Sequence, residues 1–320
     1  MNIRVKIPQI SKQIYYQETF NVFINKYSKI GPQWTKHQME WMNGIYKSFK
    51  DHDKFLIIIH LIKKTLDSYS RNFTKLSFEE FYLRDTVEIE KFNISDISKQ
   101  LNIPKETTRR KVHELENSLI IKKNKETIII DRSAFPYVKA IESIIRISRF
   151  LSSLSKILSN EKILPKPLST TKLEKIIQDN FSYVWKLYYE VQIPMLLNYK
   201  KAFSDIETFH IFGTCVVNQH LYAQKKNTKV KTKSEFIKSV YKSNNMPGLN
   251  AMSISDITGI PRATVVRKLK KLTKLKHLSI DNKKHYKLTG NFVKKLIPLQ
   301  EEILSKLSTF STKVFNLAIL

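Results

Sequence analysis

The apolar positions of residues 252–272 predict two helices joined by a tight turn. The first, "MSISDIT", is short and is followed by Gly259, the residue that most readily takes the left-handed conformation at a helix end. Pro261 then suits the first turn of a second helix, over 261–274. Apolar residues recur in that helix at i, i+4 and i+7, namely Val265, Leu269 and Leu272. The second helix therefore has one buried stripe and one basic face.

The segment after these helices alternates between apolar and polar residues. "HLSIDNKKHYKLTG" at 277–290 has an Asn-Lys-Lys tip, which predicts a β-hairpin. A long amphipathic helix over 290–320 follows, and Thr289 is suited to cap its start. The two short helices and the hairpin form one unit over about 249–289.

The same order of elements is predicted 157 residues earlier. A helix "ISDISKQL", a turn "NIP", a helix over 104–117 and a hairpin "LIIKKNKETIIID" occupy about 92–131. Asn102 stands where Gly259 stands in the later copy, and asparagine is the next residue to tolerate a left-handed turn. A long amphipathic helix over 134–160 follows this copy too.

The similarity extends upstream of the turns, with a spacing of 154 residues. There "FKDHDKF" faces "FSDIETF", and an apolar helical segment follows each. We therefore interpret the chain as an internal duplication, with a first repeat over 1–160 and a second over 161–320. The boundary lies near Pro165 and Pro167, which break helices.

Charge points to a polyanionic partner. The chain has 320 residues, with 56 Lys and Arg against 28 Asp and Glu, a net charge of +28. Such a surface attracts nucleic acid first and an anionic membrane second. The alternative is a compositional habit, because the sequence is rich in Lys, Ile and Asn together, but that habit does not explain so few acids.

The remaining composition narrows the class of protein. Cys215 is the only cysteine, so no intramolecular disulfide and no thiolate metal site is expected. The longest apolar run, "FLIIIHLI", is far shorter than the roughly 20 residues that span a bilayer. No signal peptide and no Gly-rich phosphate loop is present. We expect a cytoplasmic protein that needs no cofactor and has no membrane partner.

The helix, "GIP" or "NIP" turn, second helix and basic hairpin resemble a winged helix-turn-helix. The stretch "DNKKHYKLTG", leading into a long helix, resembles the wing of MarR-type bacterial regulators. The resemblance implies a mainly α fold with two winged domains, each flanked by helices, in a pseudo-two-fold arrangement. The polar spacers at 70–93 and 224–252 are longer than in that family, and tandem winged domains also occur in plasmid replication initiators.

The helix-turn-helix interpretation assigns the DNA contacts. The basic helix faces are expected to enter the major groove, and the hairpin tips to rest on phosphates. A solvated basic surface is the alternative for each. The candidate residues are Lys105, Glu106, Thr107, Arg109, Arg110, Lys122, Lys123, Lys125, Arg262, Thr264, Val266, Arg267, Lys270, Lys283, Lys284 and His285.

Other chemistry has weaker support in the sequence. Asp51 in "DHD" is expected to cap a helix, because the matching "DIE" keeps only its aspartate, Asp205. His210, Cys215 and His220 lie on an apolar helical run and are expected to be structural. The aromatic stretches at 15–27 and 181–189 are interpreted as core, with an effector pocket as the alternative. No arrangement indicates catalysis or a metal site.

These observations predict a double-stranded DNA-binding protein, a transcriptional regulator in which one chain acts as a pseudo-dimer. The long helices at 134–160 and 290–320 are expected to pack together, as the dimer helices of two protomers do. Further self-association into a homodimer stays open. A replication initiator and a winged protein-interaction module are the alternatives.

Overall fold

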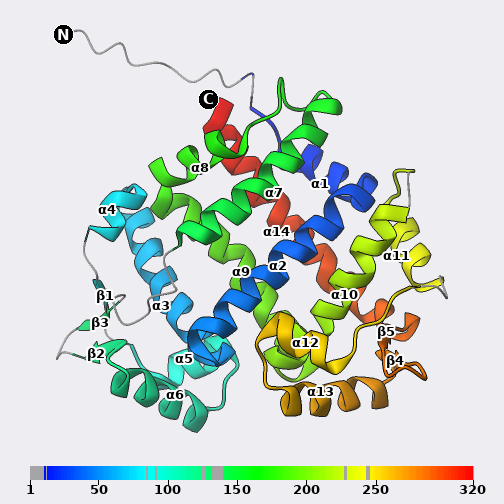
Figure 1. The fold of residues 1–320 in the computed structure, drawn as a ribbon. Coiled ribbons are helices and arrows are strands. Elements are labelled where there is room, and N and C mark those ends of the chain that lie inside the picture. The colour runs from blue at the N-terminus through cyan, green and yellow to red at the C-terminus, as the bar shows by residue number, and fades with distance from the viewer. Residues whose placement is uncertain are drawn as a thin grey trace.

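A computed structural model describes residues 11, 13–83, 86–90, 92–123, 127–131, 140–226, 229–242 and 246–319. These residues form a mainly helical fold with two small antiparallel sheets, as predicted at that level (Figure 1). The first half contains α1 (Tyr16–Asn25), α2 (Tyr27–Phe49), α3 (His52–Arg71), α4 (Phe78–Tyr82), β1 (Thr86–Glu90), α5 (Ile94–Leu101), α6 (Lys105–Asn117), β2 (Ile121–Lys123), β3 (Thr127–Asp131) and α7 (Ile141–Asn160). The second half contains α8 (Thr170–Asp179), α9 (Phe181–Phe203), α10 (Ile206–Lys226), α11 (Lys233–Lys242), α12 (Ala251–Thr258), α13 (Arg262–Lys274), β4 (Leu278–Ile280), β5 (Tyr286–Leu288), a 3-10 turn (Gly290–Phe292) and α14 (Val293–Ile319).

Four pairs of matching helices in the two halves have equal lengths. Helices α1 and α8 have 10 residues each, and α2 and α9 have 23. Helices α5 and α12 have 8 residues, and α6 and α13 have 13. Four helices of the second half therefore have the same order and the same lengths as four helices of the first half.

The turn residues identified from sequence have the predicted conformation. Asn102 ends α5 with φ +48°, and Gly259 ends α12 with φ +70°. Both angles are in the left-handed region, where glycine and asparagine are least strained. Pro104 and Pro261 each lie one residue before the following helix, at its N-cap. The chain thus reverses direction within three residues in both places.

Each turn unit is completed by a small sheet. In the first, β3 pairs antiparallel with β2 and also with β1, giving the order β1-β3-β2. In the second, β4 pairs with β5, and Leu249 forms an isolated bridge to Tyr286. The hairpins were predicted, but β1, α4 and α11 were not, because they lie inside the two polar spacers. Residues 124–126, which include Lys125, lie outside the described residues.

The two halves are intertwined rather than docked as separate bodies. Helix α2 of the first half packs against α10, and α9 of the second half packs against α3. Helix α7 packs against α8, and α14 packs against α1. Each half therefore completes its hydrophobic core with helices of the other half.

The predicted packing of the two long helices on each other is wrong. The main partners of α7 are α8 and α2, and those of α14 are α9 and α1. Phe150 of α7 packs on Trp34 of α2, with ring centroids 5.3 Å apart, and Phe310 of α14 packs on Tyr188 of α9 at 5.8 Å. The apolar stripes are thus covered by large aromatic side chains of the central helices, which bury more surface than a second narrow stripe.

The bounds of the long helices also differ from the prediction. Helix α7 begins at Ile141, and residues 132–139 lie outside the described residues. The segment predicted to be helical from about residue 290 begins with the 3-10 turn and continues as α14 from Val293. The Thr289 hydroxyl, which was expected to cap the start of this helix, donates to the carbonyl of Lys276. Within the described residues, no helix combines the length and the apolar character that a membrane crossing requires.

Candidate nucleic-acid interface

Helices α6 and α13 lie along one edge of the molecule, the lower edge in Figure 1. The strands of each turn unit lie at the two outer ends of this edge. The helices of the bundle, with α2 and α9 at its centre, lie behind it. The two helices that were expected to contact DNA therefore share one edge of the structure.

The inner face of each of these helices is fixed by apolar packing. Val265, Leu269 and Leu272 of α13 are fully buried, as the predicted stripe requires. In α6 the matching positions are Thr108, Val112 and Leu115, and all three are buried. The Thr108 hydroxyl donates to the carbonyls of Ile103 and Pro104, so its polar group is satisfied.

A lysine holds each helix to the bundle. Lys268 of α13 pairs with Asp205 at 2.8 Å, and Lys271 donates to the carbonyl of Phe203 at 3.3 Å. Lys111 occupies the matching position of α6 and pairs with Asp51. A second pair, Lys54 to Glu114 at 2.8 Å, joins α3 to α6.

The two aspartates have a double role. Asp51 caps α3 by accepting from the backbone N–H groups of Asp53 and Lys54, and Asp205 accepts from the backbone N–H of Thr208 at 2.7 Å. The predicted capping is confirmed for both. Burial opposes ionisation of Asp205, but the hydrogen bonds from Lys268 and Thr208 outweigh it, so its pKa lies below the usual value. The carboxylate is thus charged and ties α13 to α10, the helix that it caps.

This tether was missed in the sequence, although a signal was present. The repeated Arg-Lys pair was noted, and its arginines were assigned to DNA. In the structure the pair divides, because Arg110 and Arg267 are exposed whereas Lys111 and Lys268 point to the bundle. The recurrence of both an aspartate and a lysine at matched positions was the available sign of an ion pair.

The charged side chains on the outer face of α13 are all positive. The whole helix contains six cations and no acid, and two of the six, Lys268 and Lys271, are those bonded to the bundle. Arg262, Arg267 and Lys270 are exposed, and Thr264 and Val266 are partly exposed. An open hollow of about 560 Å³ on this face is lined by Arg262, Ala263, Val266, Arg267 and Lys270. In the part of the chain that the structure describes, the three cations of this hollow form no ion pair.

The outer face of α6 is mixed. The helix contains four cations and three glutamates. Arg109 donates to both carboxylate oxygens of Glu106, at 2.9 and 2.8 Å, and both side chains are exposed. Arg110 lies 3.8 Å from Glu114, Lys105 is exposed and Thr107 is partly exposed. The predicted residues of α6 thus share one exposed face, but its charges largely compensate each other.

The described lysines of the first hairpin are paired with acids, whereas those at the tip of the second hairpin are exposed. Lys122 pairs with Asp131 at 3.1 Å and Lys123 with Glu116 at 2.7 Å. At the second hairpin Lys283 and Lys284 are exposed. Asp281 accepts from the backbone N–H groups of Lys283 and His285, and its carboxylate lies 3.8 Å from the His285 ring. This aspartate therefore shapes the tip and leaves both lysine side chains pointing to solvent.

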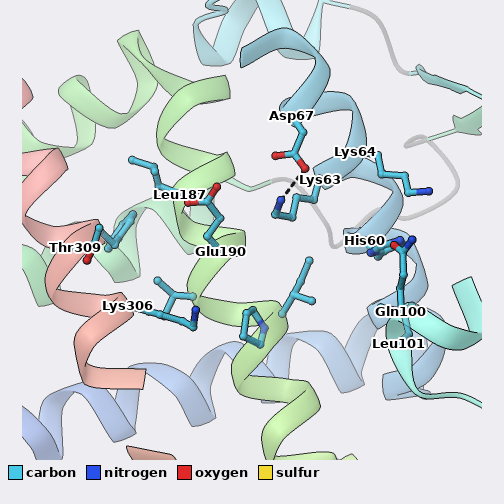
Figure 2. A pocket seen from close by; sticks show the side chains of 14 residues that line it. His60, Lys63, Lys64, Asp67, Gln100, Leu101, Leu187, Glu190, Lys306 and Thr309 are labelled. Carbon is cyan, nitrogen blue, oxygen red and sulfur yellow. Dashed lines mark hydrogen bonds and ion pairs between the residues drawn. The ribbon is translucent and has the colours of Figure 1, made fainter. Parts of the chain in front are cut away.

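A pocket of about 610 Å³ lies behind the first turn unit, between α3, α5, α9 and α14 (Figure 2). Its apolar lining includes Leu101, Leu187 and Phe310. Its charged lining comprises three lysines and two acids, namely Lys63, Lys64, Lys306, Asp67 and Glu190. Lys63 pairs with Asp67 at 2.7 Å within it. Apart from Leu187, the aromatic stretches that were weighed as an effector pocket contribute no residue to it.

Histidines meet where the two halves join. His52 of α3 lies 3.2 Å from His210 of α10, ring nitrogen to ring nitrogen, and His210 also bonds Asn43 of α2 at 2.8 Å. Burial lowers the pKa of His52 to about 4 and holds the pKa of His210 well below its usual value, so both rings are neutral. Cys215 is buried, which raises its pKa to about 12. The side chains of His52, His210 and Cys215 are all buried. No group of three or more His, Cys, Asp or Glu that could hold a metal ion occurs in the described residues.

Comparison with models of protein families, with curated proteins and with solved structures finds no match for this chain. Its function therefore has to be argued from its own residues.

Proposed function

We propose that the chain is a double-stranded DNA-binding protein, a transcriptional regulator that acts as a single-chain pseudo-dimer. In this proposal the two turn units are winged helix-turn-helix domains of a MarR-like kind, in a duplicated frame over 1–160 and 161–320. The supporting observation is the shared edge formed by α6 and α13, on which Arg110 and Arg267 are exposed at matched positions (Figure 1).

The chemistry of that edge suits a duplex. The major groove of B-DNA admits one α-helix, and arginine can donate two hydrogen bonds to the edge of guanine. Lysines at the outer hairpins can contact phosphates on either side of the groove. The net charge of +28 strengthens the attraction of the whole molecule to a polyanion. No catalytic step is part of the proposal.

Two alternatives remain beside it. A replication initiator would also bind duplex DNA through two winged domains, and it would differ by acting at an origin rather than a promoter. A winged protein-interaction module would not bind duplex DNA at all. The exposed cations of α13 favour DNA over the protein module, because a surface with one sign of charge attracts the polyanionic backbone of a duplex.

The proposal includes a small-molecule effector in the pocket of Figure 2. Gln100 and Leu101 of α5 line it together with residues of α9 and α14, so a bound ligand would touch both the first turn unit and the other half of the chain. Anilinonaphthalene sulfonate, an apolar anion that fluoresces in apolar sites, is a direct probe. We expect Lys64→Gln with Lys306→Gln to weaken its binding and to leave the neutral analogue N-phenylnaphthylamine unaffected.

A salt titration of binding to a random duplex tests the main proposal. The logarithm of the affinity should fall with the logarithm of the salt concentration, with a slope of about −0.9 for each phosphate contacted. Fluorescence anisotropy of a labelled duplex between about 50 and 200 mM salt covers the useful range. Binding that is absent at low salt, or that does not change with salt, would remove DNA from the account.

A further inference from the structure

We infer that the two helices divide the work of DNA recognition. Helix α13 supplies most of the affinity for phosphates, whereas α6 is restrained by Glu106 and engages fully only where it meets a cytosine. This inference rests on the proposed function, because it concerns the same edge of the molecule.

Matched positions carry opposite chemistry in the two helices. Glu106 of α6 corresponds to Ala263 of α13, and Glu114 corresponds to Lys271. The result is a net charge of +1 on α6, from four cations and three acids, against +6 on α13. Two helices of 13 residues at one edge therefore present very different fields to a duplex.

The restraint on α6 is a two-pronged ion pair. Both oxygens of Glu106 accept from the same guanidinium nitrogen of Arg109, at 2.9 and 2.8 Å. The side chains are 76% and 58% exposed, so solvent screens the pair and it is weak enough to open. If Arg109 leaves this ion pair to contact only a phosphate, the Glu106 carboxylate is left facing another negative charge. A backbone contact by Arg109 is therefore opposed by its own neighbour.

The hairpins extend the contrast beyond the helices. Lys122 and Lys123 each have an acidic partner, Asp131 and Glu116. Among the described residues, neither Lys283 nor Lys284 has one. Phosphate contacts by these two lysines therefore need no existing ion pair to break, whereas the other basic side chains of this hairpin, His285 and Lys287, lie 3.8 and 3.5 Å from Asp281.

A cytosine changes the balance at α6. The cytosine amino group donates to a carboxylate, and guanine accepts from arginine. Glu106 and Arg109 are one helical turn apart, so a cytosine and a nearby guanine satisfy both side chains at once. On α13 the groups between the cations are Ala263 and Val266, which offer apolar contact to a thymine methyl. The bound site is thus asymmetric, with a strongly salt-dependent half under α13 and a G·C-containing half under α6.

Removing the Glu106 side chain tests the inference, because the substitution should strengthen DNA binding rather than weaken it. We expect Glu106→Ala, which installs the residue found at the matched position of α13, to tighten binding to a random duplex about fivefold. One charge at about 4 Å in water is worth about 1 kcal/mol, which gives that factor. Glu40→Ala is the matched control, because Glu40 is an exposed acid of α2 that pairs with Lys36. It changes the net charge equally and should leave affinity nearly unchanged.

The matched arginines supply the second arm of the experiment. Arg267→Ala should reduce the salt slope by about 0.9, whereas Arg110→Ala should reduce it much less. Sequences selected from a random pool should lose their preference for cytosine in one half-site when Glu106 is alanine. If the wild-type chain binds duplex but Glu106→Ala behaves like Glu40→Ala, or both arginine variants lose equal slope, the division of work is wrong and the proposed function stands. If the wild-type chain binds no duplex, the proposed function itself fails.

Discussion

Removal of the Asp205 carboxylate tests how α13 is held in place. The carboxylate caps α10 through Thr208 and pairs with Lys268 at 2.8 Å. Loss of a capping side chain costs about 1 kcal/mol. Loss of a charge-assisted hydrogen bond costs about 1.5–3 kcal/mol, and the 34% exposure of the Asp205 side chain places this one at the lower end. We therefore expect Asp205→Ala to lower the free energy of unfolding by about 2–3 kcal/mol, measured by urea denaturation.

A double-mutant cycle separates the ion pair from the cap. Asp205→Ala, Lys268→Met and the double variant should give a coupling energy of about 1–2 kcal/mol. The pair between Lys175 and Asp179 is the control, because its side chains are 78% and 58% exposed and 3.7 Å apart. Its coupling should stay below about 0.5 kcal/mol. A coupling for the Asp205 pair no larger than that of the control would refute the tether.

The effect of Asp205→Ala on the affinity for a duplex is expected to be opposite to the effect that its charge change alone predicts. Asp205→Ala makes the chain more basic, so the overall field favours tighter binding. If the tether positions α13, the variant instead binds a duplex more weakly, because the helix loses the ion pair that fixes it. Tighter binding by this variant, in a protein that is still folded, would contradict the positioning role of Asp205.

Three further predictions concern stability. The neutral buried histidines have pKa values in the folded protein below the unfolded value of about 6.5, so stability is lost as the pH falls below 6.5. Each histidine should lower the free energy of unfolding by about 1 kcal/mol between pH 6.5 and 5.5. A urea midpoint that does not change over this pH range would contradict the prediction. These histidines are His37 (pKa about 3), His52 and His220 (pKa about 4) and His210. Gly259→Ala should cost about 1–2 kcal/mol in urea denaturation from the φ of +70° alone, since no atom lies within 4 Å of the added carbon. Asn102→Gly should cost nothing at the matched turn, and a loss there equal to that of Gly259→Ala would refute the strain argument.

The parts of the fold that could be predicted from the sequence are those determined by residues close together in the chain. Gly259 and Asn102 end their helices through their own backbone preferences, and the Asn-Lys-Lys hairpin needs only a short alternating pattern. Strand β1 was missed because its partner β3 lies about forty residues later, and a short polar-flanked segment such as "TVEIE" is a strand only once it pairs. The partners of α7 and α14 depend on aromatic residues in the other half of the chain, so periodicity identified the helices and not their packing.

In the candidate site, too, the sequence predicted features that depend on neighbouring residues and missed those that depend on distant ones. The exposed arginines were found because they follow a recognisable turn. The ion pair between Lys111 and Asp51 joins residues 60 positions apart, so only the recurrence of both residues in the second half indicated it, and neither local segment did. The charge compensation on α6 was readable, because Glu106 and Arg109 are three residues apart, but its bidentate geometry required the structure.

Hydroxyl-radical footprinting of the DNA complex, combined with the mass of the complex, tests the central claim most directly. The account predicts one chain on one duplex, with two protected tracts centred about one helical turn apart, roughly 34–36 Å. Both tracts should shrink to background as salt rises. Two chains on a symmetric palindrome, with one recognition helix of each away from the DNA, would contradict the single-chain pseudo-dimer, and no protection at low salt would contradict DNA binding altogether.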